Sequence, residues 1–82
     1  MKVEEIMNNI MKEKGISKAQ LGRAVGVEKE KNPSDVINKR MKQKNISVNV
    51  LSEMLAAMGY TIAIVPNGPN LKAGEYEVTI NE

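Results

Sequence analysis

The sequence of 82 residues contains no cysteine and no histidine. Without cysteine, disulfides, thiolate nucleophiles and most structural zinc sites are excluded, and without histidine the most common general base is missing. Only carboxylates, lysine, tyrosine and hydroxyl groups remain for chemistry, and the spacing of the carboxylates predicts no pair that meets a third ligand. The scattered glycines form no phosphate-binding motif. We therefore expect a protein that is not an enzyme and that uses no cofactor or metal ion.

Aromatic residues are almost absent, since the chain has two tyrosines, no phenylalanine and no tryptophan. The core must therefore be built from isoleucine, valine, leucine and methionine, which gives little apolar area per residue. The methionines are accordingly interpreted as core residues rather than as cofactor ligands. A chain of this length holds one domain, so we expect a second subunit to add stability.

Long hydrophobic runs are missing as well. The longest apolar stretches, at residues 54–58 and 62–65, fall far short of the ~18 residues that a transmembrane helix needs. No cleavable signal sequence opens the chain. We therefore expect a cytoplasmic protein that has no membrane partner.

The first half of the sequence has the pattern of two helices separated by a short turn. Apolar residues recur at helical spacing over residues 3–14, and Gly15 is typical of a helix end. Ser17 is then an N-cap, because Gln20 three residues later completes a capping box. This second helix is short, since Gly26 ends it nine residues after the cap.

Two further helices are predicted between residues 32 and 59. Asn32 followed by Pro33 is a strong start signal, and the third helix is expected to run to about residue 44. Residues 28–31 alternate in charge and are interpreted as a solvated connection before it. Ser47 caps the fourth and most hydrophobic helix, which Gly59 ends.

After residue 59 the period of the sequence changes from helical to alternating. Residues 60–65 and 75–80 alternate as strands do, and the turn-rich residues between them predict an antiparallel β-hairpin. Such a hairpin is marginal by itself and has exposed edges, so we expect it to form a two-fold dimer interface. The predicted interface residues are Ile62, Ile64, Tyr76, Val78 and Ile80.

Two stretches of the sequence are similar to the Cro/lambda-repressor family of helix-turn-helix regulators, the XRE-type family. They are SKAQLGRAVGV at residues 17–27 and ISVNVLSEMLAAMGY at residues 46–60. The resemblance covers about residues 3–60. It implies a mainly α fold, a lambda-repressor-like domain of four to five helices over residues 1–59, to which residues 60–82 add the predicted β-hairpin as a dimerisation element of the same domain.

The resemblance also assigns roles to individual residues. In this family a capping hydroxyl opens the second helix, here Ser17, and a leucine four residues later enters the core, here Leu21. A small residue, here Gly22, then permits contact with the third helix. The sequence departs from the family at Lys18, where glutamine is common, and at residues 28–31, which lengthen the turn before the third helix.

The third helix has a polar outer face suited to the major groove. If Ile37 and Met41 point inward, the polar residues 35, 38, 39 and 42 share the outer face at helical spacing. Asparagine can pair with adenine, and lysine can reach the acceptors of guanine. We expect base contacts from Ser34, Asp35, Asn38, Lys39 and Lys42, and phosphate contacts from Ser17, Lys18, Arg40 and Lys44.

Charge is distributed unevenly along the chain. Residues 36–59 carry four cationic side chains against one glutamate, a local charge of +3, whereas residues 60–82 carry one lysine against three glutamates, a local charge of −2. A lysine-rich helix is by itself more often a solvated surface than a nucleic-acid contact. Together with the helix-turn-helix resemblance, however, the local positive charge predicts a sequence-specific double-stranded DNA-binding transcriptional regulator. We expect a homodimeric repressor of a palindromic operator. The alternative is an antitoxin-like module whose C-terminal strands bind a protein partner.

Overall fold

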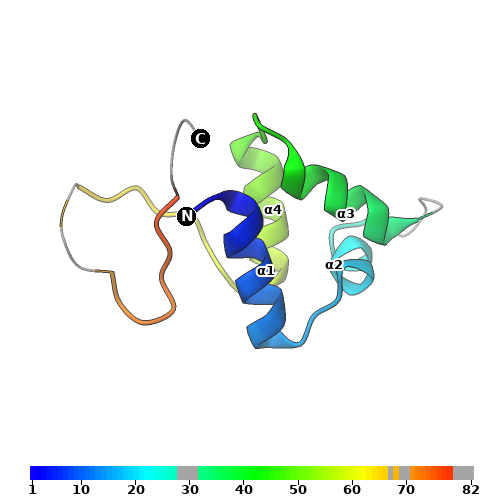
Figure 1. The fold of residues 1–82 in the computed structure, drawn as a ribbon, viewed down its shortest axis with the longest axis horizontal. Coiled ribbons are helices and arrows are strands. Elements are labelled where there is room, and N and C mark those ends of the chain that lie inside the picture. The colour runs from blue at the N-terminus through cyan, green and yellow to red at the C-terminus, as the bar shows by residue number, and fades with distance from the viewer. Residues whose placement is uncertain (28–31, 67, 69–70, 79–82) are drawn as a thin grey trace.

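The computed structural model describes residues 1–27, 32–66, 68 and 71–78. In this part of the chain the regular structure consists of helices α1 (Val3–Lys14), α2 (Lys18–Ala24), α3 (Pro33–Lys42) and α4 (Val48–Ala57) (Figure 1). The prediction of a mainly helical protein is confirmed. Helix α3 ends two residues earlier than predicted, because the backbone of Gln43 is extended, with φ −65° and ψ 132°. Residues 28–31, the predicted insertion, lie outside the described residues.

The predicted N-caps are formed by side chains. The Ser17 hydroxyl accepts a hydrogen bond from the Gln20 N–H at 3.1 Å, and the Gln20 side chain accepts one from the Ser17 N–H at 2.8 Å, so the capping box is complete. Asn32 Oδ1 accepts from the Asp35 N–H, and the Ser47 hydroxyl accepts from the Val50 N–H. Each bond satisfies a backbone donor that the helix itself leaves unpaired.

The core is aliphatic and rich in methionine. Met7, Ile37 and Met54, from α1, α3 and α4, are completely buried. The rest of the buried core consists of Ile6, Ile10, Met11, Leu21, Met41, Leu55 and Met58. Methionine fills the space that aromatic rings would otherwise occupy, as its flexible side chain allows. The interpretation of the methionines as core residues is therefore confirmed for those described as buried.

Helices α2 and α3 pack against each other at very short range. A Cβ atom placed on Gly22 of α2 would lie 2.8 Å from Pro33 Cβ and 3.0 Å from Pro33 O, at the start of α3. Only a residue without a side chain fits there, which agrees with the predicted role of Gly22. The first turn of α3 is thereby held directly against α2, on the right in Figure 1.

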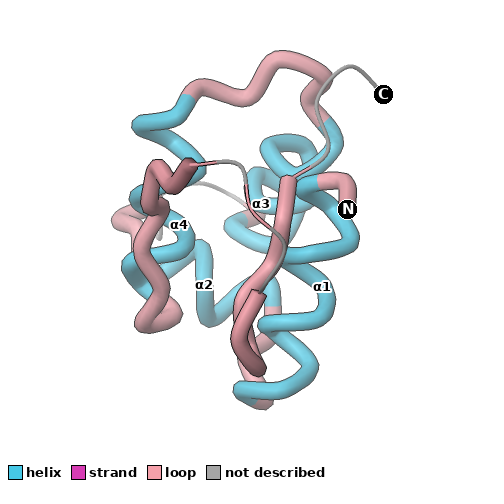
Figure 2. The backbone as a smooth tube through the Cα atoms, turned by 90° about the vertical axis from the view of Figure 1, so that its left-hand side faces the viewer, coloured by secondary structure: helices cyan, strands magenta, loops and turns pink. Residues whose placement is uncertain are grey.

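The described residues of the C-terminal segment, 60–66, 68 and 71–78, lie toward the end of the long molecular axis opposite α2 and the start of α3 (Figure 1, Figure 2). The predicted antiparallel hairpin is not confirmed, because none of the described residues of this segment lies in a strand. Alternation is a local preference that needs a paired strand to be realised. Residues 76–78 instead return to α1 and α4, and the Met1 ammonium group donates to the Glu77 carbonyl oxygen at 2.7 Å.

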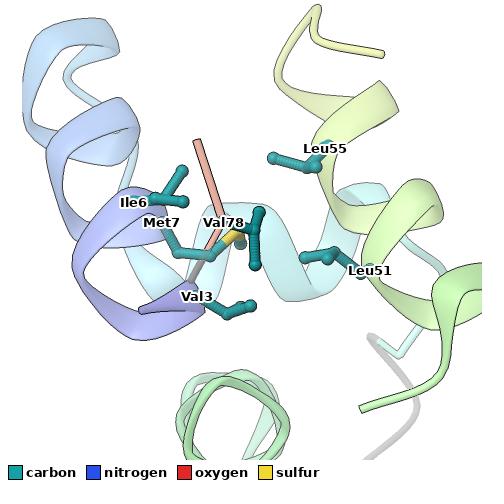
Figure 3. A pocket seen from close by; sticks show the side chains of 6 residues that line it. All are labelled: Val3, Ile6, Met7, Leu51, Leu55 and Val78. Carbon is teal, nitrogen blue, oxygen red and sulfur yellow. The ribbon is translucent and has the colours of Figure 1, made fainter. Parts of the chain in front are cut away.

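Val78 lies at an apolar groove between α1 and α4 and remains partly exposed. The groove is lined by Val3, Ile6 and Met7 from α1 and by Leu51 and Leu55 from α4 (Figure 3). Only about 20 Å³ of free space remains beside these side chains, roughly the room that one water molecule needs. Within the described residues, no helix combines the length and the apolar character needed to cross a membrane.

Candidate nucleic-acid interface

The predicted base-contacting residues lie on the side of α3 that faces away from the core. Ile37 and Met41 are buried as predicted. On the other side, Lys39 and Lys42 are exposed, and Asn38 is half-buried. Ser34, near the start of α3, is half-buried, and Asp35 is exposed. The five residues therefore follow one surface along the length of the helix.

A hydrogen bond joins this surface to α2. Lys18, the first residue of α2, donates from Nζ to Asn38 Oδ1 of α3 at 2.8 Å. The sequence predicted a phosphate contact for Lys18 and a base contact for Asn38, and the two side chains in fact meet. No sequence signal points to this contact between residues twenty positions apart, because it depends on how closely the two helices approach. It makes the start of α2 and the middle of α3 one continuous surface.

A second polar contact lies within α3 itself. Lys39 Nζ is 3.2 Å from Asp35 Oδ2, in the i, i+4 arrangement, and both side chains are at least half exposed. An exposed pair of this kind stabilises a helix by only about 0.3–0.5 kcal/mol. The ion pair therefore reduces the local positive charge in the free protein, but it is weak enough for a ligand to replace it.

Arg40 departs from its predicted exposure. The side chain is half-buried, and its Nη1 atom is buried without a hydrogen-bond partner among the described residues. Arg40 follows Val36 by one helical turn, and Val36 is also half-buried. The spacing of these two residues in the sequence could therefore have indicated that Arg40 lies at the border of the core. Lys44, just beyond α3, is exposed as predicted.

Ser17 lies at the surface with its hydroxyl oxygen engaged in the cap. Because that oxygen accepts from the Gln20 N–H, the hydroxyl proton stays free to be donated to an external acceptor. Of the other predicted phosphate contacts, Lys18 meets the outer face of α3 at Asn38 and Lys44 lies just beyond the end of α3, whereas Arg40 lies at the border of the core. The described structure thus brings Lys18 and Asn38 together and leaves Asp35, Lys39 and Lys42 on the exposed side of α3, but it does not place Arg40 on that side.

The predicted dimer residues are divided by the structure. Ile62 and Ile64 are exposed, Ile64 completely. Tyr76 is half-buried beside α1, and Val78 lies at the α1–α4 groove but remains 47% exposed. Ile80 lies outside the described residues. Of the described residues in this set, Ile62, Ile64 and Val78 are therefore exposed, and Tyr76 is the one that is partly covered by its own chain.

Tyr76 has an environment that favours its neutral form. Partial desolvation raises the pKa of its hydroxyl above the ordinary value of 10.0, and the neighbouring Glu13 and Tyr60 raise it further. The ring of Tyr60 is in turn approached by the Lys14 ammonium group, 5.7 Å from the ring centre. The contact of Lys14 with Tyr60 joins the start of the C-terminal segment to the end of α1. None of these residues belongs to α2 or α3, the two helices that form the candidate DNA surface.

Neither a metal-binding site nor a match to a known protein suggests another function for the chain. Among the described residues no three carboxylates lie close enough together to hold a metal ion. No family model, curated protein or solved structure matches the chain. The similarity to the Cro/lambda-repressor family therefore depends on the quoted residues alone, and the function has to be argued from the surface of α2 and α3.

Proposed function

We propose that the chain is a sequence-specific double-stranded DNA-binding transcriptional regulator of the Cro/lambda-repressor type, in which α3 enters the major groove. The observation that carries this proposal is the uncovered polar side of α3, joined to the start of α2 by the Lys18–Asn38 hydrogen bond. A helix is about 10–12 Å wide with its side chains, and the major groove is about 12 Å wide. A helix of this width can enter the groove, and the polar side of α3 would face the base edges.

The side chains of this surface match the chemistry of base edges and phosphates. Asn38, Lys39 and Lys42 offer N–H donors, and the acceptors of the bases lie in the major groove. Ser34 lies near the helix start, where a hydroxyl reaches a base or the backbone. Asp35 is paired with Lys39, and we expect this weak pair to open when Lys39 contacts DNA. Ser17, Lys18, Arg40 and Lys44 would contact phosphates on either side.

The electrostatic asymmetry of the molecule supports the same orientation. The acidic residues 60–82 carry a charge of −2, and residues 36–59 carry +3. The described C-terminal segment lies away from α2 and α3 (Figure 1). The basic end therefore faces an approaching duplex while the acidic end is turned away, which favours binding through α3.

A repressor of a palindromic operator needs two copies of α3, which a two-fold homodimer would supply. Ile62 and Ile64, together with Val65 and Leu71, are exposed apolar side chains of the C-terminal segment. Pairing with the same segment of a second copy would cover these side chains and supply the strand partners that the alternating sequence favours. The α3 helices of a dimer would then bind a palindromic operator with half-sites ~34 Å apart, and occupancy of the operator would repress transcription.

The exposed C-terminal segment also favours a second candidate function. Ile64 is fully exposed and Val65 is 71% exposed, which is unusual for neighbouring aliphatic residues of a stable monomer. An antitoxin-like regulator would bind a protein partner with this segment while α3 binds DNA. Sedimentation of the purified chain separates the two candidates: a dimer that Ile64→Asp dissociates supports homodimerisation, whereas a strict monomer refutes it.

Binding to random-sequence duplex at several salt concentrations tests the DNA proposal. Each phosphate contact contributes about −0.9 to the slope of log K against log salt, so three cations at phosphates predict a slope of roughly −2.7 per subunit. Replacing Asn38, Lys39 and Lys42 by alanine should abolish preference for a selected operator. The matched control, Lys12→Ala with Lys72→Ala, removes the same charge away from α3. An absent slope, or undiminished operator binding by the folded triple variant, would refute the proposal.

A further inference from the structure

The Lys18–Asn38 hydrogen bond fixes which end of the Asn38 amide faces outward. An ammonium group has only donors, so the amide atom 2.8 Å from Lys18 Nζ is the oxygen, and the amide nitrogen is turned away from Lys18. This nitrogen donates to no described residue, and the buried side-chain atom without a partner in the described part of the chain is Arg40 Nη1. The Asn38 nitrogen is therefore open to solvent on the outer side of α3.

The orientation changes what Asn38 can bind. An asparagine that recognises adenine must accept a hydrogen bond from the adenine amino group and donate one to N7. Here the accepting oxygen lies against a full positive charge, which disfavours the approach of another donor, such as the amino group of adenine or cytosine. What the pair offers to a ligand is the Asn38 N–H groups and the remaining N–H groups of Lys18. The pair is thus a cluster of donors.

We infer that Lys18 positions the Asn38 amide so that the pair recognises guanine. This inference rests on the proposed function and adds to it the base that α3 selects. The major-groove edge of guanine presents two acceptors, N7 and O6, whereas that of adenine presents one acceptor and one donor. The inference replaces two expectations, adenine for Asn38 and a phosphate contact for Lys18, so Arg40 and Lys44 remain as the cations at phosphates and the expected salt slope becomes roughly −1.8 per subunit. Phosphate oxygens are acceptors too, and the experiment must distinguish them from guanine.

The test compares base preference in the full-length chain and two variants. Duplexes selected from a random pool define the operator, and affinities are then measured with each base pair at every half-site position. For the unmodified chain we expect guanine at one position to be favoured over adenine by about tenfold or more, the discrimination of a good bidentate contact. Lys18→Met removes the ammonium group at similar length, so the preference should shift toward adenine at that position alone.

Asn38→Asp provides an independent variant. The carboxylate still accepts from Lys18 but has no N–H to donate, so the preference for guanine at this position should disappear. Lys12→Met, the same substitution on α1, should leave every preference unchanged. Circular dichroism confirms that each variant is folded, and both test residues are at least partly exposed.

Three outcomes would overturn the inference. If Lys18→Met keeps the guanine preference, Lys18 does not position the contact. If Lys18→Met weakens all sequences by one factor and lowers the magnitude of the salt slope by about 0.9, the pair binds a phosphate and not a base. If the unmodified chain favours adenine at the position that responds to Asn38→Asp, the amide is oriented the other way. In all three cases the chain still binds DNA, so the proposed function survives, whereas a chain without salt-dependent binding would remove both.

Discussion

Replacing Gly22 by alanine should destabilise the protein, although alanine is the better helix former. In an exposed helix position the change from glycine to alanine stabilises by about 0.8–1.0 kcal/mol. At Gly22 the new Cβ atom would lie 2.8 Å from Pro33 Cβ and 3.0 Å from Pro33 O. Neither atom can move freely, because one belongs to a proline ring and the other to the backbone at the start of α3. Helix α2 must therefore shift relative to α3.

The size of the effect follows from two opposing terms. Overpacking of this kind typically costs about 1–3 kcal/mol, which exceeds the gain in helix propensity. We expect a net loss of about 1 kcal/mol in the free energy of unfolding, and a domain of this size then loses roughly 4–8 °C in melting temperature. Circular dichroism at 222 nm, followed during thermal and urea denaturation, measures both quantities.

Gly68→Ala is the matched control for Gly22→Ala. At this position the nearest atom to a new Cβ is Pro66 O at 3.7 Å, an ordinary contact distance, so stability should change by less than about 0.5 kcal/mol. A Gly22→Ala protein that melts at a higher temperature than the unmodified chain would show that helix propensity decides the outcome. The close contact of α2 and α3 would then be refuted.

Three further predictions concern the core, a helix cap and the C-terminal segment. Ile37→Val removes one methylene from a fully buried side chain and should cost about 0.5–1.5 kcal/mol in urea denaturation, whereas Val48→Ala at a position that is 68% exposed should change stability by less than about 0.5 kcal/mol. Ser47→Ala removes the cap of α4 and should cost about 1 kcal/mol; an unchanged urea midpoint would contradict the cap. Because the pKa of Tyr76 is raised in the folded state, its contribution to stability is present below pH 10.0 and is lost as the pH rises through the raised pKa. Titration followed by ultraviolet absorbance should show a tyrosine whose pKa lies above 10.0. Glu13→Gln should lower this pKa, and an unchanged pKa in that variant would contradict the predicted effect of the Glu13 charge on Tyr76.

The helices were predictable because their signals are local. Ser17 and Gln20 are three residues apart, and a capping box needs no information beyond that spacing. The burial of Ile37 and Met41 follows from helical periodicity in the same way. The close contact at Gly22 was predictable only through the resemblance to a family, since a glycine inside a helix does not by itself indicate which element approaches it.

The features that the sequence did not predict depend on distant parts of the chain. Lys18 and Asn38 belong to different helices, and each has the character of a surface residue. The half-burial of Arg40 depends on how α3 lies on the core. In the C-terminal segment, alternating residues such as Ile62 and Ile64 indicate a strand, but a strand requires a neighbour with which to pair. The described residues of one chain do not provide that neighbour.

The packing of α2 against α3 links the stability of the domain to the chemistry of its surface. Lys18 and Gly22 are four residues apart on α2 and therefore face the same way, toward α3. Because Gly22 has no side chain, Pro33 lies against the helix backbone, and the distance between the helices lets Lys18 reach Asn38. A larger residue at position 22 would separate the helices and lengthen that hydrogen bond, releasing the Asn38 amide to rotate. The glycine that permits the fold therefore also determines which groups α3 presents outward.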